Sequence, residues 1–99
     1  MIRYRIEMSQ GARDLMPHLP PEFKRKVKAA LRAIADDPYQ GKELKEELAG
    51  LRSFRIARAR IIYRIQGSIL EIVAFGSRAD IYERAATELS KALRKGSTD

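Results

Sequence analysis

The sequence contains no cysteine among its 99 residues, which excludes disulfide frameworks, thiolate metal sites and cysteine nucleophiles. Its only histidine is His18, which lies between Pro17 and Leu19. One chain therefore cannot assemble a histidine metal cluster, and a Ser-His-Asp triad would have to use this single residue. A lone histidine beside a helix break is typical of a solvated side chain. We expect no metal site and no cofactor.

Long apolar runs are also missing. The longest, from Ile72 to Phe75, has four residues, whereas a membrane-spanning helix needs about 20. The first residues, Met-Ile-Arg-Tyr-Arg-Ile, lack the apolar core of a secretory signal. We therefore expect a cytoplasmic protein with no membrane partner.

Acidic residues are scarce relative to basic ones. Twenty Lys and Arg stand against thirteen Asp and Glu, which gives a net charge of +7 and an isoelectric point near 10.1. Such an excess predicts an anionic partner, either nucleic acid or an acidic protein segment. The length suits one domain, residues 1–99, and no repeat or linker interrupts it.

Periodicity predicts one strand and two helices in the first half of the chain. Residues 2–8 alternate between apolar and polar side chains, as in a half-buried strand. Ser9 is a suitable N-cap for a short helix that Pro17 ends. A second helix is predicted to begin near Pro20 and to end before Pro38. Its apolar face consists of Phe23, Val27, Ala30, Leu31 and Ile34.

The second half changes to the period of strands. Residues 39–50 read as a loop with one short helical turn, which leucines 44, 48 and 51 anchor. The apolar face switches between Phe54 and Ile61, so a tight turn or bulge is predicted between residues 56 and 60. Residues 69–75 form a nearly continuous apolar strand, typical of a central position covered on both faces. Asp80 and Glu83 have the spacing of a capping box and open a last helix.

The predicted order is therefore β-α-α-β-β-β-α. Strands joined by consecutive hairpins pair antiparallel, and the helices have to cover the sheet. We predict an α+β fold: a single compact domain whose mainly antiparallel sheet is packed by a helical hairpin and a C-terminal helix.

Basic charge is concentrated in one hairpin. Five arginines fall within thirteen residues, with no acid between Leu51 and Leu70: Arg52, Arg55, Arg58, Arg60 and Arg64. On a strand, Arg60 and Arg64 project from the same face. Arginine suits bidentate recognition of phosphate, but it also serves as a solvated strand residue with a long apolar stem. Composition does not separate RNA, DNA or an acidic chain as the partner.

Several runs of this sequence together resemble the RelE/ParE toxin superfamily. They include Leu-Arg-Ser-Phe-Arg-Ile at 51–56, Arg-Ile-Ile-Tyr-Arg-Ile at 60–65, then Ile72 to Gly76, Arg78 and Ile81-Tyr82. The earlier pattern agrees, with Leu19-Pro20, Asp37-Pro38-Tyr39, Gly41-Lys42, Leu44, Leu48 and Gly50-Leu51. The resemblance covers nearly the whole chain in the expected order.

This resemblance implies a toxin of a type II toxin–antitoxin pair, with a cognate acidic antitoxin as its partner. RelE-like members cut messenger RNA on the ribosome without a metal. The 2′-hydroxyl of the RNA attacks the adjacent phosphorus and leaves a 2′,3′-cyclic phosphate. ParE-like members instead inhibit DNA gyrase and lack the nuclease residues. A catalytically silent member is a third alternative.

The resemblance also implies residue roles. Arg60, Arg78 and Tyr82 match the catalytic pattern of the RelE-like members. The two arginines would stabilise charge on the phosphoryl oxygens, and the tyrosine ring would stack on an unstacked base. Arg55, Arg58 and Arg64 are the expected RNA- and phosphate-binding residues. The sequence departs from the family at Arg55 and Ala57, on the first hairpin strand, where members often carry lysine, and the missing lysine favours the two alternatives.

Overall fold

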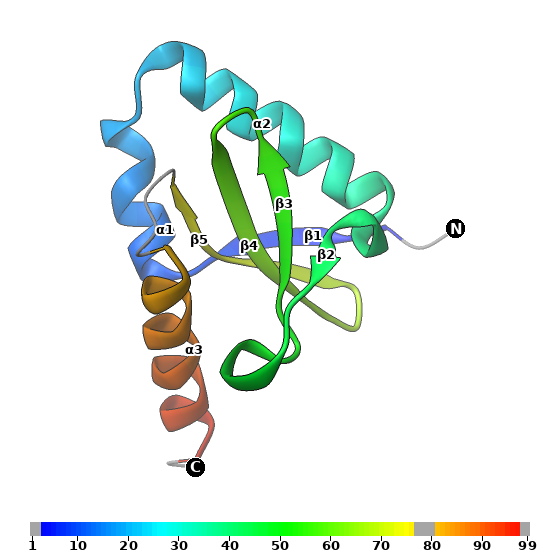
Figure 1. The fold of residues 1–99 in the computed structure, drawn as a ribbon, viewed down its shortest axis with the longest axis vertical. Helices are drawn as coiled ribbons and strands as arrows, with labels where there is room; N and C mark the ends of the chain where they lie inside the picture. The colour runs from blue at the N-terminus through cyan, green and yellow to red at the C-terminus, as the bar shows by residue number, and fades with distance from the viewer. Residues whose placement is uncertain (1–2, 77–80, 98–99) are drawn as a thin grey trace.

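The computed structural model describes residues 3–76 and 81–97, and within them five strands form one sheet (Figure 1). The sheet has the order β1-β5-β4-β3-β2. Strand β1 runs parallel to β5, and the other neighbouring pairs are antiparallel. The predicted α+β class with a mainly antiparallel sheet is thereby confirmed. The strands are β1 (Arg5–Met8), β2 (Lys42–Glu43), β3 (Arg52–Ile56), β4 (Ala59–Gln66) and β5 (Ile69–Gly76).

Three α-helices accompany the sheet in the described ranges: α1 (Gln10–Leu15), α2 (Pro21–Asp36) and α3 (Ile81–Ser97). Local signals set their bounds as predicted. The Ser9 hydroxyl accepts a hydrogen bond from the Ala12 N–H at 3.1 Å and caps α1. Pro21 occupies the first position of α2, where its missing N–H costs nothing. The predicted cap at Asp80 lies outside the described residues.

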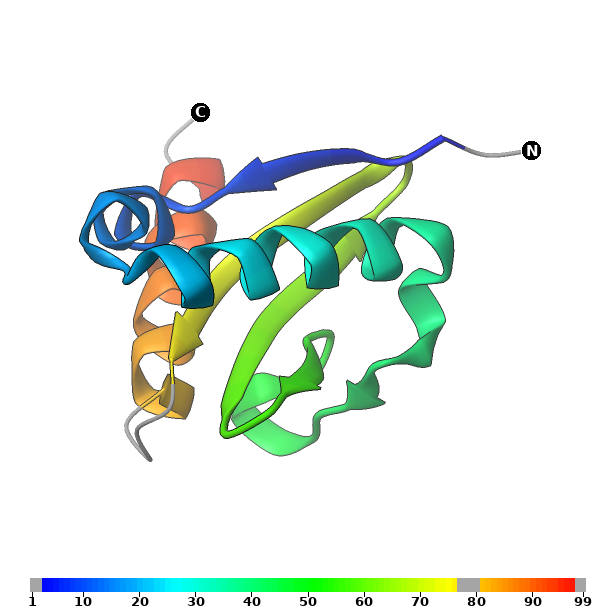
Figure 2. The same cartoon turned by 90° about the horizontal axis from the view of Figure 1, so that it is seen from above.

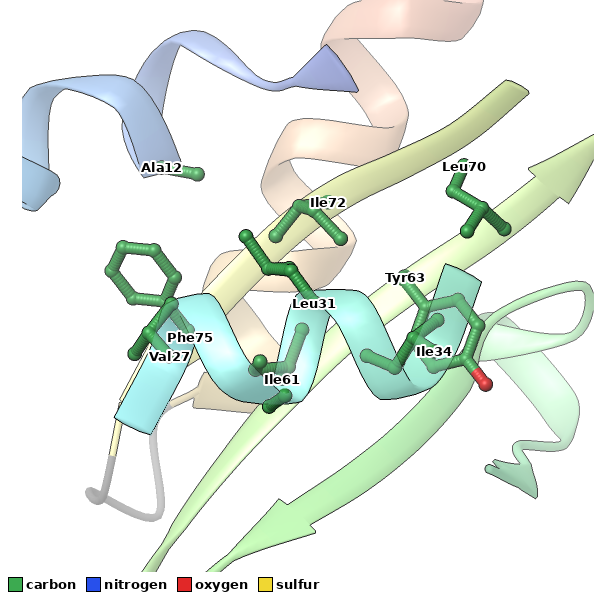
Figure 3. Packing of buried hydrophobic residues seen from close by; sticks show 10 residues of the cluster. Ala12, Val27, Leu31, Ile34, Ile61, Tyr63, Leu70, Ile72 and Phe75 are labelled. Atoms are coloured by element: carbon green, nitrogen blue, oxygen red, sulfur yellow. The ribbon is translucent and has the colours of Figure 1, made fainter. Parts of the chain in front are cut away.

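Helices α1 and α2 cover one face of the sheet. Figure 2 shows α2 lying across the strands, and Figure 3 shows its apolar side chains directed at β4 and β5. The cluster facing α2 draws on α1, α2 and both strands: Ala12, Val27, Ala30, Leu31, Ile34, Ile61, Tyr63, Leu70, Ile72 and Phe75. Four of the five predicted apolar residues of α2 are buried here, and Phe23 is partly buried against them.

Helix α3 and the 3₁₀ turn η3 (Glu46–Leu48) cover the opposite face. A β-bulge adds a residue on this side of the sheet. Ile62 pairs with Ala74 and Tyr63 pairs with Ile72, so Val73 is the extra residue in β5. The two-sided burial predicted for residues 69–75 is therefore confirmed. The cluster facing α3 consists of Leu51, Ile62, Val73, Ala74, Ile81 and Ala85, with Leu44, Leu48 and Tyr82 at its margin.

The structure corrects one part of the prediction and confirms a second. Within the predicted loop at 39–50, Lys42–Glu43 forms strand β2, which pairs with Arg52 and Ser53. Two residues are too few for a periodic signal, so this strand was missed.

The predicted turn is confirmed: Ala57 and Arg58 join β3 to β4, and Ala57 has a φ of +52°. A left-handed alanine costs roughly 1–2 kcal/mol.

The Tyr63 hydroxyl ties the sheet to the turn η2 (Pro38–Gln40) that follows α2. It donates to the Pro38 carbonyl at 2.6 Å and accepts from the Gly41 N–H at 3.2 Å. A Cβ atom on Gly41 would collide with this hydroxyl, so the contact explains the glycine. Burial raises the pKa of the Tyr63 phenol above its usual value and outweighs the opposing effect of the Gly41 hydrogen bond.

We predict that Tyr63→Phe lowers the free energy of unfolding by about 1–3 kcal/mol, because it leaves a buried carbonyl and a buried N–H without their partner. The substitution also has a pH signature. The unfolded chain loses the phenolic proton near pH 10.0, before the folded chain does. The wild type therefore loses this contribution to stability as the pH rises above 10. Denaturant unfolding from pH 8 to pH 11 measures both effects, and equal pH slopes for wild type and variant would contradict the second.

Candidate functional site

The clustered arginines separate onto different parts of the sheet. Arg55 and Arg60 are directly opposite each other in the β3–β4 ladder, so their side chains share a face. Phe54 and Ile61 alternate with them and belong to the α2 side. Arg55 and Arg60 therefore lie on the face that α3 covers.

Arg60 is held by a buried hydroxyl. Its Nη1 donates to Ser53 Oγ at 3.3 Å, and Ser53 is only 3% exposed. Arg55, which is exposed, donates from Nε to the Ala57 carbonyl at 3.2 Å. The two like charges thus use different acceptors, and only Arg60 is bound to the interior of the sheet.

Arg64 forms an ion pair with Glu71, its cross-strand neighbour on β5. The two side chains are 16% and 24% exposed. The sequence stretch around Arg64 contains no acid, yet the next strand supplies one. The lack of a nearby acid in the sequence predicts that the charge of the cluster is uncompensated, and for Arg64 this prediction is wrong.

Arg52 lies near the β2 edge of the sheet, on the face that α2 covers, and binds the neighbouring backbone. Its Nη1 donates to the carbonyls of Tyr39 at 3.1 Å and Gly41 at 2.8 Å. Its guanidinium carbon also lies 5.1 Å from the centroid of the Tyr39 ring. Arg52 thereby fastens the segment between α2 and β2.

Arg58 is exposed in the hairpin turn and borders a groove of about 770 Å³ at the start of α2. Lys26 and Arg84 also line this groove. The rest of the lining is largely apolar and includes Leu15, Leu19, Phe23 and Ile56. The groove therefore joins apolar walls to basic side chains.

Of the predicted catalytic residues, the structure brings Arg60 and Tyr82 to the same face of the sheet. Tyr82 is half-buried against the cluster facing α3. Arg78 lies outside the described residues. His18 is exposed in the turn η1 (Met16–His18), as its sequence context predicts.

Two residues that bind the arginines were not predicted from the sequence: Ser53, which binds Arg60, and Glu71, which pairs with Arg64. Glu71 is the only charged residue in the apolar strand and could have indicated that a cation is near. Ser53 gives no such signal, because its role depends on the cross-strand register.

In the described ranges, no group of three His, Asp or Glu side chains could hold a metal ion. Over those same ranges, no helix is long and apolar enough to cross a membrane. What the site offers is fixed positive charge: guanidinium groups donate hydrogen bonds without titrating, which suits an anion such as a phosphodiester.

Comparison with known proteins gives a consistent result. The sequence profile of the family described as the ParE toxin of type II toxin–antitoxin systems matches residues 2–82. Among solved structures, a chain of the Mycobacterium tuberculosis toxin–antitoxin complex RelBE2 is 32% identical, with a TM-score of 0.71, over 81% of this chain and 97% of that one. No curated protein is similar enough in sequence to give a match.

Two more distant structures share the fold. A mutant of the E. coli toxin RelE in the free state has a TM-score of 0.74 at 13% identity, over 87% of this chain and 97% of that one. A chain of the YoeB–YefM toxin–antitoxin complex from Staphylococcus aureus has a TM-score of 0.62 at 20% identity, over 71% and 91% of the two chains.

The geometry predicts that Arg64 and Glu71 contribute to stability as a pair. Because both side chains are largely buried, we expect Arg64→Ala and Glu71→Ala each to lower the unfolding free energy by about 1–2 kcal/mol. Their effects should be non-additive in a double-mutant cycle. Arg55→Ala removes an exposed side chain and should change stability by less than about 0.5 kcal/mol. Additive losses at positions 64 and 71 would show that the pair is not coupled.

Proposed function

Because the chain belongs to the ParE toxin family, within the RelE/ParE superfamily of type II toxin–antitoxin toxins, we propose that it is a ribosome-dependent messenger-RNA endonuclease. The observation that carries this proposal is the position of Arg60. Its guanidinium is half-buried and bound to Ser53, on the same face of the sheet as Tyr82 and Arg55.

In the proposed reaction, the 2′-hydroxyl of the RNA attacks the adjacent phosphorus. A new oxygen–phosphorus bond forms, the bond to the following 5′-oxygen breaks, and a 2′,3′-cyclic phosphate remains. The 2′-hydroxyl gives up its proton to water, and the leaving 5′-oxygen takes one up from water as a 5′-hydroxyl. Negative charge develops on the phosphoryl oxygens during this displacement. Arg60 and Arg78 stabilise that charge, and because arginine keeps its proton, they act by charge and hydrogen bonding rather than as bases.

The other predicted residues bind the RNA. Tyr82 stacks its ring on an unpaired base, the usual contact for single-stranded RNA. Arg55 and Arg58 are exposed and attract the flanking phosphates. Arg64 has a weaker case as a phosphate ligand, since Glu71 already occupies its guanidinium.

An acidic antitoxin is the proposed protein partner. The net charge of +7 and the groove that combines apolar walls with Lys26, Arg58 and Arg84 suit an acidic amphipathic segment. The similar chains from RelBE2 and YoeB–YefM are described as parts of toxin–antitoxin complexes, which supports the same arrangement here.

Inhibition of DNA gyrase is the second candidate, and two findings favour it. The matching family profile carries the description of ParE toxins. Ala57 in the hairpin turn also gives this chain no lysine where many RelE-like members have one. This candidate needs neither Arg60 nor Tyr82 for chemistry, so the two functions predict different responses to substitution.

Expression of this chain alone should arrest growth, and co-expression of its acidic partner should restore it, because the partner covers the basic surface. Growth curves after induction, with the amount of soluble protein checked in parallel, measure the effect. Normal growth at confirmed soluble expression would leave the catalytically silent alternative.

Arg60→Ala and Arg78→Ala should each lower the cleavage rate by roughly 10²–10³, as the loss of one preorganised donor does. Ribosome binding should change much less, because the other basic residues remain. Tyr82→Phe should keep most of the activity, whereas Tyr82→Leu should lose it while still filling space against the cluster facing α3. Primer extension on a translated message measures cleavage.

The matched control is Arg32→Ala on α2, which removes one exposed positive charge away from the site. It should cleave like the wild type. Intact message with wild-type protein, together with inhibition in a supercoiling assay, would support the gyrase candidate. Equal cleavage by Arg60→Ala and wild type would place the active site elsewhere.

A further inference from the structure

Tyr39 is the one large apolar side chain in the described ranges that is strongly exposed, at 62%. It lies in η2, beside the β2–β3 edge of the sheet. The core does not use its ring, and neither does the proposed cleavage site. A single exposed ring is common on protein surfaces, so what distinguishes Tyr39 is the set of contacts that hold it.

The backbone that carries this ring is held on several sides. Asp37 accepts a hydrogen bond from the Tyr39 N–H at 3.2 Å. Arg52 binds the Tyr39 carbonyl at 3.1 Å and the Gly41 carbonyl at 2.8 Å. The Tyr63 hydroxyl fixes the neighbouring Pro38 carbonyl at 2.6 Å. The ring thus stands on a turn whose conformation is set before any ligand arrives.

One side of the ring already has a stacking partner. The Arg52 guanidinium carbon is 5.1 Å from the ring centroid, within the range of a cation–π contact. With one side occupied by a cation and most of the ring in solvent, a flat group can add to the stack. Because both side chains are ordered beforehand, such binding costs little conformational entropy.

We propose that Tyr39 and Arg52 form a stacking platform for an unpaired nucleobase of single-stranded RNA. This platform rests on the proposed action on RNA and adds a second base contact to it. Rings backed by guanidinium groups stack any base through its π-face. The net charge of +7 favours a polyanion over an uncharged aromatic ligand.

The platform is separate from the cleavage site. Arg52 alternates with Arg55 on β3 and lies on the opposite face of the sheet. They are three positions apart, which is roughly 10 Å along a strand. An RNA strand that passes around the β2–β3 edge of the sheet therefore reaches both places, and the platform would help to set the register of the RNA.

The absence of tryptophan allows a direct test. Tyr39→Trp introduces one tryptophan at the platform, and its fluorescence can be excited apart from that of the remaining tyrosines. We expect oligoadenylate RNA to quench its fluorescence and an abasic RNA of the same length to leave it unchanged. Tyr39→Ala should weaken oligoadenylate binding by about 5- to 100-fold, as the loss of one base stack does. The salt dependence should stay the same, because no phosphate contact is lost. Tyr39→Phe, the matched control, should bind like the wild type.

The outcomes separate this inference from the proposed function. Binding of oligomers needs no ribosome and no cleavage, so the platform can stand even if primer extension shows intact message. Equal affinity for intact and abasic RNA, or unchanged affinity in Tyr39→Ala, would overturn the platform even in an active nuclease. Loss of antitoxin binding in Tyr39→Ala with RNA affinity unchanged would also overturn it and would make the ring a protein contact.

Discussion

Strand β5 is covered on both faces, and its apolar side chains from Leu70 to Phe75 belong to the clusters facing α2 or α3. Glu71 is the one polar residue among them. A half-buried carboxylate in a central strand is costly unless a cation pairs with it. Arg64 meets this need from the directly opposite position on β4. Because a half-buried carboxylate needs a cation, one arginine of the basic hairpin, Arg64, is used to stabilise the fold.

The edge of the sheet commits a second arginine. Strand β2 has only two residues, so the segment from Pro38 to Gly41 depends on side chains for many of its hydrogen bonds. Tyr63 and Arg52 supply them. Three of the five arginines, Arg55, Arg58 and Arg60, then remain for an anionic partner. The net charge predicts an anionic partner, but the cross-strand register is needed to show which arginines are available to bind it.

Local patterns in the sequence predict much of the fold, because the residues that determine these elements lie close together in the chain. The Ser9 cap, the proline at the start of α2, the turn before Ala59 and the buried strand at 69–75 are all visible there. The parallel pairing of β1 with β5 joins residues far apart in sequence. Strand β2 and the partners of Arg52 and Arg64 depend on the register that sets which residues lie opposite each other, and periodicity carries no information on register. For the site, alternation predicts the face of Arg60, whereas its bond to Ser53 needs the register.

Ser53 bears on what Arg60 is suited to do. Apart from the phenol of Tyr63, it is the one polar side chain that is buried among the residues whose burial the structure describes, at a position where an apolar residue would pack without needing a partner. Its hydroxyl accepts from Arg60 and so limits the directions in which that guanidinium can point. Attraction of a polyanion gains little from such restraint, because salt-dependent binding needs only nearby charge. Stabilisation of a transition state gains much, because donors fixed beforehand do not have to reorganise as charge develops. A buried serine beneath Arg60 therefore favours a chemical role for this arginine over general electrostatic attraction.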